Sequence, residues 1–209
     1  MGEWTAETLV VALGDSTTAG TPYYLSPVES PPEGFGDVTS QFTYWLMQSH
    51  PEWRVLNCGV NGERTDQIAE RFDRDVLEPE PLAVIILAGV NDVYQGHLVP
   101  DIIGRLREMY DRAAAASIPV VAASIVPYNS ATPAQNIAMH AINDWIAAEA
   151  ERDPNIDFVD TRKAVAAPDN IDKLISSPDG LHPDIDGYHR MADAIAPVLE
   201  AVLSRPIRI

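Results

Sequence analysis

The sequence predicts an α/β protein of three layers, an α/β/α sandwich in which helices cover both faces of a five-stranded parallel sheet. Short apolar runs alternate with amphipathic segments throughout the 209 residues, an order typical of right-handed βαβ units. The run Leu82-Ala83-Val84-Ile85-Ile86-Leu87 is apolar without interruption, as in a strand buried on both faces. With no linker and no internal repeat, the length predicts a single domain, 1–209.

The elements follow from the spacing of apolar residues. Short, mostly apolar runs that end at glycine or a polar loop predict strands at 8–13, 54–58, 82–87, 119–124 and 156–159. Apolar residues three or four positions apart predict helices, most clearly where Ile68, Phe72 and Val76 follow one another. The predicted helices cover 40–49, 65–77, 100–116, 133–152 and 188–203.

Two stretches, 20–38 and 164–178, fit neither pattern. The first is rich in proline and glycine, contains Tyr23, Tyr24 and Phe35, and is too long for an ordinary connection. Loops at the carboxyl ends of parallel strands form the binding site in such folds. A surface Ω-loop and a substrate-shaping loop are both compatible with this stretch.

The charge of the chain excludes several partners. Thirty-one acidic against fourteen basic residues give a formal charge of −17, which repels phosphate backbones and anionic lipid heads. We therefore expect no nucleic-acid partner and no membrane partner, and neutral substrates rather than anionic ones. A saline habitat and a GC-rich genome would each account for the acidity. The sequence leaves the oligomeric state open.

The apolar runs, the N-terminal residues and the cysteine count limit where the protein can reside and which sites it can form. No run approaches the roughly 18 apolar residues of a membrane-spanning helix. Glu3 and Glu7 precede the first apolar run, the wrong charge for a signal peptide. We expect a soluble protein, cytoplasmic as given, or secreted if a signal peptide has been removed. The single cysteine, Cys58, excludes an internal disulfide and a Cys-rich zinc site, and we expect it to be a small buried hydrophobe.

Four short blocks carry the chemistry. They are Gly14-Asp15-Ser16, Asn57-Cys58-Gly59-Val60-Asn61-Gly62, Gly89-Val90-Asn91-Asp92 and Asp179-Gly180-Leu181-His182. Three of them follow predicted strands and the fourth precedes the last helix, so we expect them to meet at the carboxyl edge of the sheet. Together they supply a nucleophile, an Asp–His pair and oxyanion donors, the groups that acyl transfer requires.

Ser16, His182 and Asp179 are the candidate catalytic residues. A serine hydroxyl is a poor nucleophile until a base takes its proton. An imidazole can take that proton and return it to the leaving group. The carboxylate of Asp179, three residues before His182, can reach Nδ1, fix the tautomer and stabilise the imidazolium.

The blocks resemble those of the GDSL, or SGNH, hydrolase family, which is named for an invariant Ser, Gly, Asn and His. The matching residues, in the family's order, are Ser16, Gly62, Asn91 and His182. The resemblance implies a flavodoxin-like SGNH hydrolase fold, hydrolysis of esters or thioesters, and neither cofactor nor metal. Thr17 stands where the family's name has leucine, and the proline-rich stretch after the first block leaves the substrate open.

The same resemblance implies the oxyanion hole. Its donors would be the backbone N–H groups of Ser16 and Gly62 and the side-chain amide of Asn91, each worth about 3–4 kcal/mol of barrier. A glycine at position 62 fits close approach of the backbone to substrate, or a turn that requires a positive φ. Asp15 and Asp92 are expected to tie loops together through hydrogen bonds to the backbone.

The predicted function is hydrolysis of acyl esters, with short-chain or O-acetyl carbohydrate esters as the preferred substrates. The candidates for lining an acyl or sugar pocket are Tyr94, Tyr128 and Leu181. Tyr23 and Tyr24 are further candidates. A thioesterase or lysophospholipase acting through the same three residues is an alternative.

Two other classes compete with an ester hydrolase. A metal-dependent phosphoesterase would gather Asp15, Asn91, Asp92, His182 and His189, but the histidines include no close pair with metal-ligand spacing. A non-catalytic carbohydrate-binding module would not need a nucleophile, a base and oxyanion donors together.

No serine lies in Gly-x-Ser-x-Gly, so the nucleophile elbow of other serine hydrolases is missing.

Overall fold

The computed structural model describes residues 8–205, and its central sheet has five parallel strands in the order β4-β1-β5-β6-β7. This confirms the predicted fold class and all five predicted strands. Their bounds are β1 Thr8–Gly14, β4 Trp53–Gly59, β5 Ala83–Leu87, β6 Val120–Ala123 and β7 Ile156–Val159. The order reverses between β1 and β5, and a reversal of this kind opens a crevice at the carboxyl ends of the strands.

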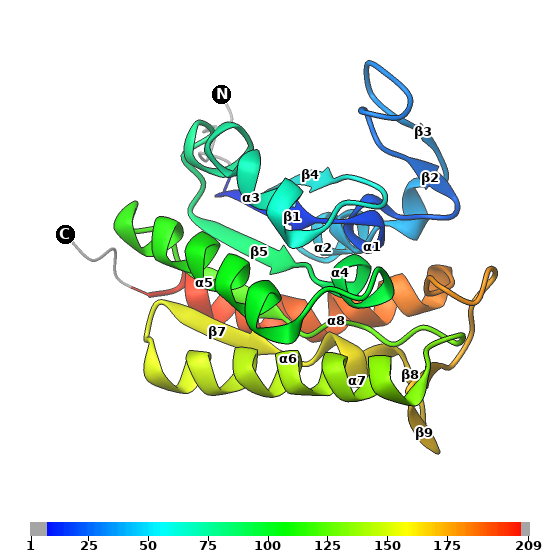
Figure 1. Cartoon of the computed structure of the whole chain (residues 1–209). Helices are drawn as coiled ribbons and strands as arrows, with labels where there is room; N and C mark the ends of the chain where they lie inside the picture. The colour runs from blue at the N-terminus through cyan, green and yellow to red at the C-terminus, as the bar shows by residue number, and fades with distance from the viewer. Residues whose placement is uncertain (1–7, 206–209) are drawn as a thin grey trace, which may run out of the picture.

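Helices cover both faces of the sheet (Figure 1). One face packs against α3 (Thr65–Glu70), α5 (Val99–Ala115) and α6 (Pro133–Arg152). The other packs against α2 (Phe42–Ser49), α7 (Thr161–Val165) and α8 (Ile185–Leu203). Side chains of a strand point alternately to the two faces, and both cores are apolar, so a central strand must be apolar at every position.

The second predicted helix, 65–77, is interrupted. The α-helical part, α3, ends at Glu70, and a π-helical turn, η2 (Asp73–Leu77), follows with the wider hydrogen bond from Glu78 N to Asp73 O. Phe72 and Val76 are nevertheless buried as predicted. The apolar spacing therefore identified the buried face of this segment but not its change of pitch.

Two helices also begin two or more residues away from their predicted starts. A 3₁₀ turn, η1 (Val38–Ser40), replaces the start of the first predicted helix. The last helix begins three residues earlier than predicted, at Ile185, because the Asp184 carboxylate accepts the Gly187 N–H and caps it.

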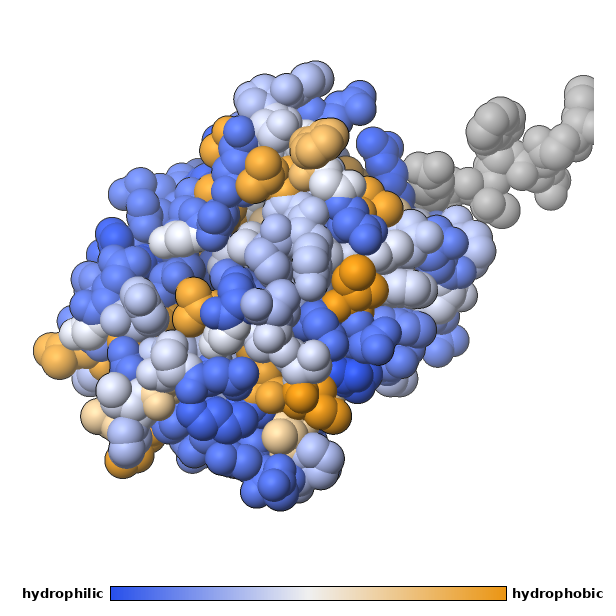
Figure 2. All heavy atoms as spheres, turned by 90° about the vertical axis from the view of Figure 1, so that its right-hand side faces the viewer, coloured by the Kyte–Doolittle hydropathy of each residue, from blue (hydrophilic) through white to orange (hydrophobic). Residues whose placement is uncertain are grey.

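The two irregular stretches contain short hairpins that the sequence did not predict. Residues 20–38 include β2 (Tyr24–Leu25) and β3 (Phe35–Gly36), and residues 164–178 include β8 (Ala166–Ala167) and β9 (Asn170–Leu174). The β2–β3 hairpin projects beyond the carboxyl edge of the sheet (Figure 1). Figure 2 faces this edge and shows a largely polar surface with apolar side chains gathered over the hairpin. The exposed large apolar or aromatic residues within 20–38 are Tyr23, Leu25, Val28, Phe35 and Val38.

None of the helices within residues 8–205 is both long enough and apolar enough to span a lipid bilayer.

Candidate active site

Three of the four blocks lie side by side at the carboxyl edge of the sheet. Gly14, the last residue of β1, pairs with Gly59 of β4 and Leu87 of β5, so the three strands end at the same level. Ser16 follows β1, while the loops carrying Gly62 and Asn91 follow its two neighbours, β4 and β5. The nucleophile candidate therefore stands between the two candidate oxyanion loops, at the point where the strand order reverses.

The structure joins the predicted residues Ser16, His182 and Asp179 in one hydrogen-bond chain. His182 Nε2 lies 2.8 Å from Ser16 Oγ, and His182 Nδ1 lies 2.7 Å from Asp179 Oδ2. Ser16 is buried, whereas the side chain of Asp179 is 31% exposed. The three side chains have the order hydroxyl, imidazole and carboxylate that passes a proton from nucleophile to base.

Asp179 is held by the backbone as well as by His182. Its Oδ1 accepts the N–H groups of Leu181 and His182, both at 2.8 Å, which leaves Oδ2 for the imidazole. Partial burial raises the pKa of Asp179, but these three hydrogen bonds outweigh it and the pKa lies below its usual value. The carboxylate is therefore ionised at neutral pH and able to stabilise an imidazolium.

The backbone around Ser16 is fixed by close packing at the end of β1. Ser16 is the first residue of a short helix, α1 (Ser16–Ala19), which Asp15 caps by accepting the Thr17 N–H at 2.9 Å. A Cβ on Gly14 would lie 2.2 Å from Thr18 Oγ1 and 2.4 Å from the Leu87 carbonyl oxygen. Glycine is thus required for the chain to turn directly from the strand into the helix that carries the hydroxyl.

Gly62 and Asn91 lie on the neighbouring loops. Gly62 has a φ of +78°, and a Cβ there would meet nothing within 4 Å, so the turn conformation rather than protein crowding requires glycine. The Asn91 amide donates one N–H to the Glu63 carbonyl oxygen at 2.9 Å and has a second N–H to offer. Asp92 accepts from the backbone N–H and hydroxyl of Thr65, the loop-tying role expected for it.

Asp15 is almost completely buried, and burial is the main reason why its pKa rises to about 7. The Thr17 N–H lowers this pKa, Asp92 raises it further and Arg71 lowers it. The native state therefore keeps a proton that the unfolded chain releases near pH 4. Because of this difference, the free energy of unfolding falls as pH rises from about 4 to about 7.

We predict that Asp15→Asn preserves the helix cap and removes this pH dependence. Relative to the original chain it should gain up to about 4 kcal/mol above pH 7, with the two curves converging near pH 4. Thermal unfolding measured across this range is the test. Asp37→Asn is the control with the opposite sign. Asp37 is exposed, caps η1 by accepting the Thr39 N–H, and has a lowered pKa because of its hydrogen bonds to Thr39. Its replacement should therefore lose a little stability above pH 4. If the free energy of unfolding changed with pH equally in the original chain and in Asp15→Asn, the raised pKa of Asp15 would be contradicted.

The three candidate substrate-lining residues differ in exposure. Tyr94 is 57% and Leu181 38% exposed, whereas Tyr128 is 2% exposed and packs its ring edge against Tyr94 at 5.8 Å between centroids. Tyr128 thus belongs to the core and packs against Tyr94. Of the three candidates, Tyr94 and Leu181 are the ones exposed to solvent.

The residues of the competing metal site are not arranged as ligands of one ion. His189 lies on α8, stacked on Trp45 with 4.1 Å between ring centroids and beside Asp193. Both nitrogens of His182 contact Asp179 and Ser16. Within residues 8–205, no cluster of three or more His, Cys, Asp or Glu side chains is arranged to hold a metal ion.

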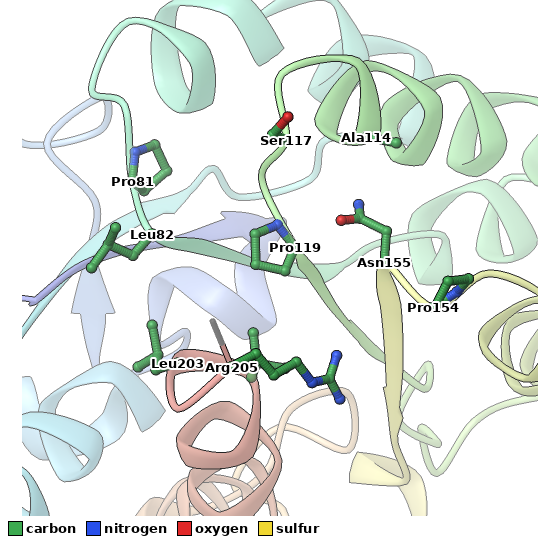
Figure 3. A pocket seen from close by; sticks show the side chains of 10 residues that line it. Pro81, Leu82, Ala114, Ser117, Pro119, Pro154, Asn155, Leu203 and Arg205 are labelled. Atoms are coloured by element: carbon green, nitrogen blue, oxygen red, sulfur yellow. The ribbon is translucent and has the colours of Figure 1, made fainter. Parts of the chain in front are cut away.

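A cavity of about 400 Å³ lies at the opposite, amino edge of the sheet. Its walls come from Pro81 and Leu82 before β5, Pro119 before β6, Pro154 and Asn155 before β7, and the end of α8 (Figure 3). It is separated from Ser16 by the length of the strands and does not belong to the candidate site. Cys58 is half-buried against the core beside Asp75 of η2, and burial raises the pKa of its thiol to about 11, so it is not a nucleophile at neutral pH.

The fold and the four blocks define an α/β/α carboxylic ester hydrolase. The chain belongs to the GDSL-like lipase/acylhydrolase family, whose model matches residues 12–190. No curated protein gives a significant match to its sequence.

Several solved structures share the fold. A protein assigned to the G-D-S-L lipolytic family from Desulfitobacterium hafniense is 25% identical, with a TM-score of 0.75 over 91% of this chain and 99% of that one. A GDSL-like lipase from Bacteroides thetaiotaomicron is 23% identical, with a TM-score of 0.72 over 93% and 89%. A variant of an acetyl-xylooligosaccharide esterase from Geobacillus is 20% identical, with a TM-score of 0.69 over 98% of both chains.

Proposed function

We propose that this chain is a serine esterase that cleaves short-chain acyl esters, including acetyl esters of carbohydrates, through an acyl-enzyme intermediate. The observation that carries the proposal is the continuous hydrogen-bond chain from Asp179 through His182 to Ser16. Such a chain gives the hydroxyl a base and gives the base a counter-ion, which a binding module does not need.

The first half of the reaction forms an ester on the protein. Ser16 Oγ attacks the acyl carbon while its proton passes to Nε2 of His182, and the carbonyl oxygen becomes an oxyanion. The Ser16 and Gly62 N–H groups and the free N–H of the Asn91 amide would stabilise that charge. The C–O bond to the alcohol then breaks, and His182 gives its proton to the departing oxygen.

Water completes the cycle. His182 takes a proton from the water molecule, whose oxygen attacks the acyl-enzyme and forms a second oxyanion at the same donors. When the bond to Ser16 Oγ breaks, His182 returns the proton to Ser16 and the carboxylic acid leaves. Asp179 is ionised throughout and balances the imidazolium charge in both halves.

The exposure of residues beside the candidate catalytic groups supports the proposed preference for small acyl groups. Tyr94, Leu181 and Gly62 are exposed, so the candidate site is open rather than enclosed by a deep channel. The formal charge of −17 disfavours anionic esters. The fold is shared with an esterase of acetylated xylooligosaccharides, so acetylated saccharides belong in a substrate panel.

The test is hydrolysis of aryl esters from acetyl to long acyl chains, beside acetylated xylooligosaccharides, a thioester and a lysophospholipid. We expect the highest kcat/KM on acetyl or other short acyl esters, no effect of a chelator, and complete inhibition by an organophosphonate that adds one group to Ser16. A sharp preference for chains above about eight carbons, or for the thioester or lysophospholipid, would replace the substrate proposal. Activity that only a chelator abolishes would favour the metal-dependent class instead, and no turnover of any ester would favour the binding module.

A further inference from the structure

A buried arginine connects the blocks of the candidate site from beneath. Arg71 lies between α3 and η2, and its side chain is 8% exposed. Its Nη2 donates to the carbonyl oxygen of Gly14, and its Nη1 to that of Cys58, both at 2.8 Å. These two carbonyls lie at the ends of β1 and β4, just before the residues that lead to Ser16 and Gly62.

The remaining contacts of Arg71 extend this connection. Its Nε donates to the Glu63 carboxylate at 2.7 Å, and its Nη1 also donates to Asp75 of η2. Glu63 is the residue directly after Gly62, and its carbonyl oxygen accepts the Asn91 amide. One guanidinium is thus linked to the Ser16 turn, to both sides of the Gly62 loop and, through Glu63, to Asn91.

We propose that Arg71 is a positioning residue that sets the distance between the Ser16 turn and the Gly62 loop, and so the geometry of the oxyanion hole. This inference rests on the proposed esterase function. Oxyanion donors act only when they are held close to the place where the charge develops. A displacement of about 1 Å at such a site costs on the order of 100-fold in rate.

The chemistry of the side chain fits this role. A guanidinium is planar and presents donors along three sides, so it can hold two carbonyls and two carboxylates in one plane of contacts. A lysine ammonium is a point charge that cannot reach all four acceptors at once. A buried cation is costly unless it is paired, and Glu63 and Asp75 supply that pairing, with side chains 20% and 12% exposed.

Arg112 is a matched control from the same region. It donates to the Ala69 carbonyl oxygen at 2.7 Å and to Asp73 at 2.6 Å, and its guanidinium lies 4.7 Å from the Phe72 ring centroid. It therefore anchors α3 and η2 from their outer side, as Arg71 does from the inner side, but none of these contacts involves a catalytic block. Losing it should cost stability without moving the oxyanion donors.

The experiment compares Arg71→Lys, Arg71→Met, Arg112→Lys and Ser16→Ala in the full chain. Thermal unfolding is measured first, and kcat and KM for an aryl acetate are then determined well below the lowest Tm. We expect Arg71→Lys to lower kcat by about 100-fold with little change in KM, and Arg71→Met to lower it at least as far. Arg112→Lys should keep the original kcat even if its Tm is lower. Titration with an organophosphonate should still label Ser16 fully, though slowly, in folded Arg71 variants.

The outcomes separate the two proposals. A folded Arg71→Lys with the original kcat, or equal losses of kcat in Arg71→Lys and Arg112→Lys, would overturn the positioning role. Failure of both Arg71 variants to fold, while Arg112→Lys folds, would assign Arg71 to stability alone and overturn it too. Full activity in Ser16→Ala would instead overturn the proposed function, whatever the Arg71 variants do.

Discussion

Ser16→Ala should lower kcat for a short-chain aryl ester by on the order of a million-fold, to the residual rate that oxyanion donors and binding alone provide. The expected loss is this large because the hydroxyl is the attacking atom and also the source of the proton that His182 takes. With Oγ gone, the contact of 2.8 Å to Nε2 no longer exists, and the imidazole has no bound nucleophile to activate. The measurement is kcat on an aryl acetate, with Tm recorded for the same sample.

The control for Ser16→Ala is Ser124→Ala, which deletes another buried hydroxyl. Ser124 Oγ accepts the Arg162 N–H at 2.8 Å beyond the end of β6 and also bonds Asp160. Its loss should cost about 1–3 kcal/mol of stability, because a buried donor loses its partner, yet leave kcat unchanged. Ser16→Ala activity within tenfold of the original chain would mean that another group is the nucleophile.

The sheet was predictable because local pattern and global fold agree. Residues of β5 are apolar at every position since each strand face meets a helix layer, and the same logic identified the other four strands. The proximity of the candidate residues was predictable because parallel strands end at one edge. That rule places the loop after β1 and the connection from β7 to α8 at the same edge, and there Ser16 and His182 meet across 166 positions of sequence.

Other features depend on contacts between distant residues, which local spacing does not encode. Nothing in the local sequence distinguishes Arg71 from other polar helix positions, whereas its Nη2 donates to the Gly14 carbonyl oxygen, 57 positions away. The π-helical η2 keeps Phe72 and Val76 buried and so leaves the apolar pattern unchanged. The strands β2 and β3 are two residues long, too short for any alternation to be seen, and Tyr128 is buried by packing that no single-residue property reveals.

Asp179→Asn should lower kcat by about 10⁴-fold at neutral pH, for a reason specific to how this carboxylate is held. Its Oδ1 accepts two backbone N–H groups, from Leu181 and His182. An asparagine must place its oxygen there, and its NH₂ group then replaces Oδ2 beside Nδ1 of His182. The imidazole would accept that hydrogen bond at Nδ1 and carry its own proton on Nε2, so it could not take the proton of Ser16.

The pH profile tests this tautomer argument. Because the pKa of Asp179 is already lowered, its protonation lies below the pH range in which the esterase is assayed and should not set the acid limb of the rate profile. The Asn variant should therefore be slow across that whole range rather than displaced in pH. The paired control is Asp184→Asn, which keeps the cap on Gly187 of α8 and should retain full activity. A folded Asp179→Asn with the original kcat would show that the carboxylate only closes the loop between Ser177 and His182.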